Sequence, residues 1–165
     1  MSTTKVGFGG GCHWCTEAVF NTLKGVNSVE QGFIRAEAPE DTWSEAVQIE
    51  FDAQIISLSV LIEIHLRTHS STANHRFREK YRSAVYSTNT EQHQLAQDTI
   101  IELGSEFAKP VVTKVLVLKE FKASPEHYQN YYENHSSGEF CQRFIDPKLA
   151  LLKRQFRNQV VASSE

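Results

Sequence analysis

The sequence lacks three features that would assign it to a large class of proteins. It has no apolar run long enough to cross a bilayer, because its longest apolar-rich segment, Ile55 to Leu66, is interrupted by serine, glutamate and histidine. It has no cluster of Lys and Arg long enough to follow a phosphate backbone, and its formal net charge is -3. It also has no internal repeat or low-complexity tract. We therefore expect no membrane partner and no nucleic-acid partner.

Cysteine is scarce, and two of the three cysteines are close together in the segment Cys12-His13-Trp14-Cys15. The first residues, Met1 to Lys5, lead directly into a strand-like segment without the apolar stretch of a secretory signal, so a cytoplasmic location is expected. In a reducing compartment an odd number of cysteines does not indicate permanent disulfides. Catalysis or metal binding is the better explanation for the pair.

The order of the predicted elements indicates the fold class. The chain of 165 residues contains no linker-like segment, so we expect one domain over residues 1–165, with a C-terminal tail from about residue 134 that is partly extended. Hydrophobic periodicity and helix-start signals predict strands over 5–9, 26–35, 45–51, 83–86 and 111–118, and helices over 16–24, 57–68, 89–107 and from 124 and 146 onward. This irregular alternation favours an α+β fold. We expect a two-layer sandwich with a mixed sheet and a ferredoxin-like core.

Cys12 is placed where a cysteine becomes a nucleophile. It follows the turn Gly9-Gly10-Gly11 and precedes the predicted helix, so the free N–H groups and positive end of that helix would stabilise a thiolate. The glycines would allow a substrate to approach the backbone closely. The alternative is an ordinary turn between a strand and a helix.

Cys15 lies three residues after Cys12, a spacing that brings two thiols within disulfide reach at the start of a helix. The two thiols would then form a redox couple. Alternatively, Cys15 is a small buried apolar residue on the first helical turn. A zinc site completed by Cys141 and a histidine is a further alternative, although no metal is expected.

The segment Phe8-Gly-Gly-Gly-Cys12-His-Trp-Cys-Thr-Glu17 resembles the nucleophile motif of the A-type peptide methionine sulfoxide reductases, a Gly-Cys-Phe-Trp-Gly run followed by a glutamate. Further segments match in order, and the resemblance covers almost the whole chain. They are 23–26, 32–33, 44–47, 63–65, Tyr81-Arg-Ser-Ala-Val-Tyr86 and Glu126-His-Tyr-Gln-Asn-Tyr-Tyr132. The Gly-Cys-x-Trp run together with Tyr-Arg-Ser-Ala before a strand is the specific part of the match.

The resemblance implies roles for several residues. Cys12 would attack the sulfoxide sulfur, Glu45 would donate a proton to the departing oxygen, and Tyr81 would be a second donor. Trp14 would line an apolar pocket for the S-methyl group of the substrate. On residue patterns alone, Glu45 would be a solvated strand residue and Tyr81 a packing aromatic.

Attack would leave Cys12 as a sulfenic acid, which a second thiol must resolve before an external reductant such as thioredoxin restores the enzyme. Cys15 and Cys141 are the candidates for that thiol, and Cys15 is slightly favoured because it is closer in sequence. The resemblance implies no cofactor, a substrate that is a protein-bound methionine sulfoxide or a small sulfoxide, and a monomer.

The sequence departs from the family at three substrate-facing positions. His13 replaces the aromatic residue after the nucleophile, and Trp43 stands near a gap where the family has a tyrosine. Arg76 aligns with a family aspartate that contacts substrate. From Arg76 and its neighbour Arg78 we hypothesise a preference for an anionic sulfoxide, against the alternative that both arginines are solvated on a surface loop.

Two other functions remain open from the sequence. One is dithiol–disulfide exchange by Cys12 and Cys15, although none of the four prolines is an evident candidate for the cis-proline that such proteins place opposite their cysteines. The other is a catalytically silent binding domain of the same fold, against which the presence of both Cys12 and Glu45 argues.

Overall fold

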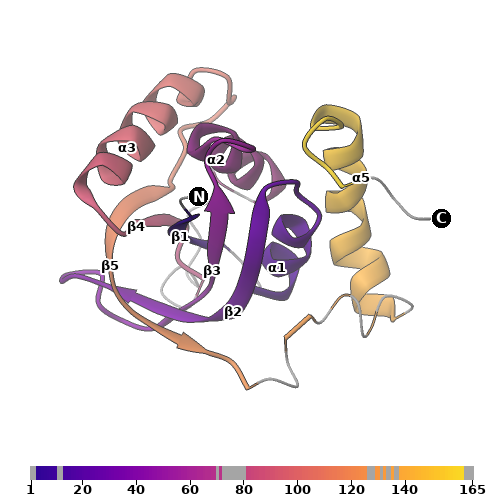
Figure 1. Cartoon of the computed structure of the whole chain (residues 1–165), viewed down its shortest axis with the longest axis horizontal. Helices are drawn as coiled ribbons and strands as arrows, with labels where there is room; N and C mark the ends of the chain where they lie inside the picture. Colours follow the sequence, from indigo (N-terminus) through magenta and orange to yellow (C-terminus); the bar gives the residue numbers. More distant parts are fainter. Residues whose placement is uncertain are drawn as a thin grey trace.

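Five strands of the chain pair into one sheet that closes on itself (Figure 1). The structure is a computed structural model that describes residues 3–10, 13–69, 71, 81–125, 129–130, 132, 135 and 138–161. The strands are β1 (Thr3–Gly9), β2 (Val26–Ala36), β3 (Ser44–Asp52), β4 (Ala84–Ser87) and β5 (Lys114–Ala123). The helices are α1 (His13–Asn21), α2 (Leu58–Thr68), α3 (Thr90–Gly104), the π-helical turn η2 (Cys141–Ile145) and α5 (Asp146–Gln155).

The strand order is β1-β3-β2-β5-β4, and β4 pairs back onto β1. All neighbours are antiparallel except β4 and β5, which run parallel, so the expected α+β class and mixed sheet are confirmed. The expected ferredoxin-like sandwich is not matched exactly, because its sheet would be open and this one is a barrel. The pairing of β1 with β4 closes the sheet, and no local sequence pattern specifies a contact between elements so far apart in the chain.

Small residues allow the barrel to close tightly. Gly7 on β1 faces the interior, where a Cβ atom would lie 2.6 Å from Ile34 Cδ1 and 3.0 Å from Tyr86 Cβ. The buried interior cluster consists of Ile34, Ala36, Ala46, Ala84 and Tyr86. Three alanines and a glycine leave room for the isoleucine and the tyrosine, so side chains fill this narrow barrel and it has the character of a packed core.

The larger core lies between the barrel and helices α1 and α2. Phe8 on β1 stacks on Phe20 of α1, with ring centroids 4.7 Å apart, and both side chains are fully buried. Alternate residues of β1 and β3, such as Val6, Val47 and Ile49, point into this core. The two elements that flank the β1–α1 connection are therefore packed in this core, and the connection contains Cys12.

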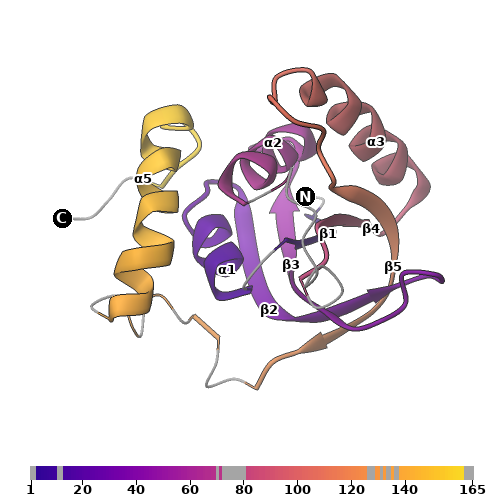
Figure 2. The same ribbon diagram turned by 180° about the vertical axis from the view of Figure 1, so that it is seen from behind.

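The C-terminal segment forms an outer layer beside α1, on the opposite side of the molecule from α3 (Figures 1 and 2). Residues Cys141–Ile145 are π-helical and Asp146–Gln155 are α-helical, so the extended conformation expected for the tail is absent from this part. The helix start predicted at Asp146-Pro147 is confirmed, with proline in the first turn. Within the described part of the chain, no helix is both long and apolar enough to cross a membrane.

Candidate active site

The chain passes from strand to helix across the predicted nucleophile motif. Strand β1 ends at Gly9 and α1 begins at His13, as the sequence predicts for a cysteine at a helix start. Cys12 itself lies outside the described residues, as do Arg76 and Arg78. The surroundings of the motif are therefore built from the residues on either side of it.

The carboxyl group of Glu45 lies at the first turn of α1. The backbone N–H of His13 donates to Glu45 Oε1 at 3.2 Å, and Glu45 is only 8 % exposed. Glu45 occupies an odd-numbered position of β3, like Val47 and Ile49, so it faces the helices and not the solvent. This shared parity is the sequence signal that could have identified Glu45 as buried without any family resemblance.

His13 lies between Glu45 and an aromatic wall. Its Nδ1 donates to the carbonyl oxygen of Gly32 at 2.9 Å, and its Nε2 is 3.6 Å from Glu45 Oε1. The His13 ring meets the Phe33 ring edge-on, with the two ring centroids 5.4 Å apart. The sequence analysis did not assign Phe33 to the site, although it lies directly opposite Glu45 in the β2–β3 register.

Trp14 connects the motif to the C-terminal segment. Its ring is 6.0 Å from that of His13 and meets Phe140 edge-on at 5.8 Å. Phe140, which immediately precedes η2, was also not anticipated as a neighbour of the site. Aromatic rings from α1, from β2 and from the segment leading into η2 therefore gather beside the motif.

The other predicted substrate-side residues lie at the rim. Tyr81 is half-buried just before β4, and the N–H of the next residue, Arg82, donates to Ser44 Oγ at 2.7 Å. Tyr81 is thereby held beside the start of β3, where Glu45 is located. Trp43 is 41 % exposed, and the Arg35 guanidinium lies 5.5 Å from its ring centroid. The structure thus brings Tyr81 close to the Glu45 segment and leaves Trp43 on the surface.

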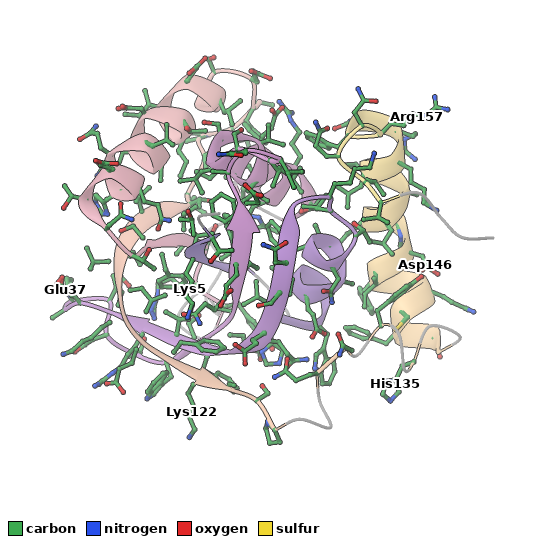
Figure 3. All side chains as sticks on the ribbon, in the orientation of Figure 1. Lys5, Glu37, Lys122, His135, Asp146 and Arg157 are labelled. Atoms are coloured by element: carbon green, nitrogen blue, oxygen red, sulfur yellow. The ribbon has the colours of Figure 1, made fainter. Side chains whose placement is uncertain are left out.

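Cys15 and Cys141 lie in one buried cluster, together with Ala18 and Ile145. Burial raises the pKa of the Cys141 thiol, and the carboxylate of Asp146 raises this pKa further. Asp146, labelled in Figure 3, begins α5 and also accepts a hydrogen bond from the Tyr132 hydroxyl at 2.5 Å. The two candidate resolving cysteines therefore share one environment.

A cavity of about 60 Å³ lies behind the motif. It is lined by Gly10, Cys15, Thr16, Val19, His65, Thr68, His69 and Lys148. His65 and His69 stack with ring centroids 4.1 Å apart, and His65 Nε2 donates to the Gly9 carbonyl oxygen at 2.8 Å. His69 was not among the predicted site residues. No group of three or more His, Cys, Asp or Glu side chains among the residues described is arranged to hold a metal ion.

The geometry can be compared with known proteins. Residues 4–160 match the sequence profile of the family described as peptide methionine sulfoxide reductase. A peptide methionine sulfoxide reductase MsrA from Deinococcus radiodurans is 34 % identical over 169 residues, which cover 93 % of this chain and 82 % of the relative. The MsrA of Pasteurella multocida is 35 % identical over 168 residues, covering 93 % and 97 %.

Solved structures share the fold. Mxr1 from Saccharomyces cerevisiae in reduced form superposes with a TM-score of 0.72 at 17 % identity, over 84 % of this chain and 89 % of that one. The same yeast protein in complex with Trx2 gives a TM-score of 0.61 at 17 % identity, over 78 % and 84 %. Together with the profile match over nearly the whole sequence, these likenesses show that the chain belongs to the peptide methionine sulfoxide reductase family.

Proposed function

We propose that this protein reduces methionine S-sulfoxide, free or in a protein chain, with a thiol as the source of electrons. The observation that carries the proposal is the buried Glu45 carboxyl group, which is fixed by the His13 N–H at the end of the motif that contains Cys12. A sulfoxide oxygen cannot leave without a proton, and a buried carboxyl group beside a nucleophilic cysteine supplies one. Membership of the reductase family supports the same reaction.

The first half-reaction uses Cys12 and Glu45. The Cys12 thiolate forms a bond to the sulfoxide sulfur, the electron pair of the S–O bond moves to oxygen, and the oxygen takes a proton from Glu45. The oxygen then bonds to the Cys12 sulfur, and the bond between Cys12 and the substrate sulfur breaks with its electron pair going to the substrate, which yields the thioether and a sulfenic acid on Cys12. The sulfoxide is thereby reduced as the cysteine is oxidised. Tyr81, placed beside the β3 start, is proposed as a second donor to the oxygen. Trp14 is proposed to line the pocket for the methyl group.

The second half-reaction needs another thiol. We assign it to Cys15, whose thiolate attacks the Cys12 sulfenic acid to give a disulfide and water. Cys141 lies in the same cluster, and we propose that it exchanges with that disulfide and so passes it toward the C-terminal segment. A dithiol reductant of the thioredoxin type then restores the thiols. The complex of yeast Mxr1 with Trx2 supports such a partner.

No cofactor enters this scheme, because the electrons come from thiols and the protons from Glu45 and water. A cytoplasmic location fits the scheme, since the thiols must return to the reduced state after each turnover. We propose that the enzyme acts as a monomer.

The test is turnover of the separate R and S epimers of methionine sulfoxide, free and blocked at both ends, with dithiothreitol as reductant. Reduction of the S epimer alone, abolished in Cys12→Ser, is expected. Cys141→Ser is the matched control, because it removes a thiol without removing the nucleophile. Reduction of insulin disulfides without any sulfoxide turnover would overturn the proposal in favour of dithiol–disulfide exchange.

A further inference from the structure

The histidine after the predicted nucleophile is buried against the proposed proton donor. The side chains of His13 and Glu45 are 9 % and 11 % exposed, and His13 Nε2 lies 3.6 Å from Glu45 Oε1. The same Oε1 accepts the His13 backbone N–H at 3.2 Å. Both contacts come from one residue, so the position of the carboxyl group is tied to the position of the imidazole.

The hydrogen bonds fix the tautomer of the ring. The Gly32 carbonyl oxygen can only accept, so His13 Nδ1, which is 2.9 Å away, must carry a hydrogen. The nitrogen that gains and loses a proton is therefore Nε2, the one that faces Glu45. Contact with the Phe33 ring at 5.4 Å and the Trp14 ring at 6.0 Å restricts rotation of the imidazole. The pair is a carboxyl group and a basic nitrogen in a site with little access to water.

The surrounding described elements carry other titratable and charged side chains, which are Cys15 and Glu17 on α1, Glu30 and Arg35 on β2, Glu50 and Asp52 on β3, Glu63, His65 and Arg67 on α2, Lys114, Lys119, Glu120 and Lys122 on β5, and Tyr81 and Arg82 before β4. The Arg82 guanidinium donates to the Glu40 and Thr42 carbonyl oxygens. Glu17 accepts from the Asn130 N–H at 2.7 Å, and Lys122 is exposed. Within the part of the chain described, His13 is a basic side chain in direct range of the Glu45 carboxyl group.

We propose that His13 is a positioning residue that shares with Glu45 the proton given to the sulfoxide oxygen. This role rests on the proposed function. Before the reaction the pair holds one proton, either on Glu45 with a neutral imidazole or on Nε2 with a carboxylate. As Cys12 bonds to sulfur, Glu45 passes this proton to the oxygen, and the pair is left as a carboxylate and a neutral imidazole. Water then supplies the next proton. Because His13 Nε2 lies 3.6 Å from Glu45 Oε1, the imidazole gives this proton a second binding position beside the carboxyl group.

The test is the pH dependence of a single turnover. Prereduced enzyme is mixed with blocked S-sulfoxide without external reductant, and methionine formation is followed from pH 5 to 10 in wild type, His13→Phe and His13→Asn. Phenylalanine keeps the aromatic contacts, and asparagine keeps a donor for Gly32. In both variants we expect the rate to decline at a pH about one unit lower, a tenfold loss near pH 8, with rates in acid changed by less than about threefold.

Two further measurements separate this role from others. Alkylation of Cys12 by iodoacetamide across the same pH range should be unchanged by His13→Phe. If alkylation shifts by as much as turnover does, His13 acts on the thiol and the proposal is overturned. Wild-type turnover with an unchanged profile in both variants would also overturn it and leave the proposed function intact. Absence of wild-type turnover on any sulfoxide would instead be a failure of the proposed function itself.

Discussion

Cys15 and Cys141, from opposite ends of the chain, are buried in one apolar cluster at 8 % and 0 % exposure. Cys15 is on the first turn of α1 and Cys141 begins η2, so the cluster joins the motif helix to the C-terminal segment. A disulfide formed at Cys15 is thus next to a third thiol. The two cysteines have different expected functions, which separate variants can resolve.

Cys15→Ser should block resolution, whereas Cys141→Ser should not. Without reductant each enzyme still reduces one sulfoxide, but in Cys15→Ser the Cys12 sulfenic acid persists and can be trapped by dimedone and located by mass spectrometry. Wild type and Cys141→Ser should instead lose two thiols to a disulfide. Thioredoxin-dependent turnover should fall by about tenfold or more in Cys15→Ser. Accumulation of the dimedone adduct in Cys141→Ser alone would reverse the assignment.

The Cys141 thiol should titrate at high pH. In a variant with Cys12 and Cys15 replaced by serine, its alkylation rate should rise with pH to a midpoint above the ordinary thiol pKa, because burial and Asp146 both disfavour the thiolate. Asp146→Asn should lower the midpoint only in part, since burial is the larger cause. Asp98→Asn, at an exposed site on α3, is the control. A midpoint at the ordinary thiol pKa in this folded variant would contradict the expectation.

The same raised pKa has a consequence for stability. A thiol that is harder to ionise in the folded state contributes stability that is fully present below its unfolded pKa, about 8.5, and is lost as pH rises through the folded pKa. Above about pH 8.5 the free energy of unfolding of wild type should therefore fall more steeply than that of Cys141→Ala. Urea titrations at pH 7 and pH 10 measure the difference. Parallel losses in the two proteins would show that Cys141 is not involved.

Glu45→Gln should remove the proton donor and leave the nucleophile reactive. We expect single-turnover sulfoxide reduction to fall by about 10²-fold to 10⁴-fold, the usual worth of a general acid. Glu50→Gln is a matched control on the same strand, because Glu50 pairs with Lys5 at 3.7 Å near the other end of β3. Cys12 alkylation should remain measurable in both variants. A Glu45→Gln enzyme with nearly full activity would remove Glu45 from the mechanism.

Gly10→Ala should destabilise the fold through His69. A Cβ atom at Gly10 would lie 2.5 Å from His69 Cδ2, and that ring is fixed by Ser83 Oγ at 2.8 Å from its Nε2. We expect a loss of about 1–3 kcal/mol in urea unfolding, as for other overpacked sites. Gly104→Ala, where a Cβ atom would meet nothing within 4 Å, should cause no loss. The added substitution His69→Ala should recover part of the Gly10→Ala loss, and failure to do so would refute the steric explanation.

Arg76→Ala tests the proposed preference for anionic sulfoxides. Replacement should reduce the ratio of kcat/KM for a carboxylate-bearing sulfoxide over a neutral one by about twofold to fivefold, the worth of one exposed ion pair. Arg157→Ala, an exposed arginine beyond the end of α5, is the control. If the kcat/KM ratio is unchanged in Arg76→Ala, Arg76 does not contribute to recognition of the substrate anion.

Local patterns predicted the elements well. The alternation of Val47, Ile49 and Phe51 predicted β3. Ser57 and Asn89 are the N-caps of α2 and α3, and each side chain accepts a backbone N–H from the first turn of its helix. These signals are contained in a few neighbouring residues. Membership of the reductase family also followed from the sequence, through the motif around Cys12 and the further segments that match in order.

The closure of the sheet and the neighbours of the site were not predictable in this way. Which strand pairs with β1 depends on long-range packing, and the available signal, a glycine at Gly7 that leaves space for Ile34, has a meaning only once the partner is known. Phe33 and Phe140 reach the site from β2 and from the segment before η2. His69 was not predicted to lie near the site, yet it stacks on His65 just after α2 ends.

The closed order of the five strands also bears on how the protein behaves when crowded. In an open sheet the outer strands present unpaired N–H and C=O groups, onto which a strand from another molecule can add. Here each of the five described strands has a partner on both sides, since β4 pairs with β1 as well as β5. The doubly paired stretches of the barrel therefore offer no template for intermolecular strand addition, whereas residues 26–30 of β2, which pair with β3 but not with β5, keep one edge to which a strand could add.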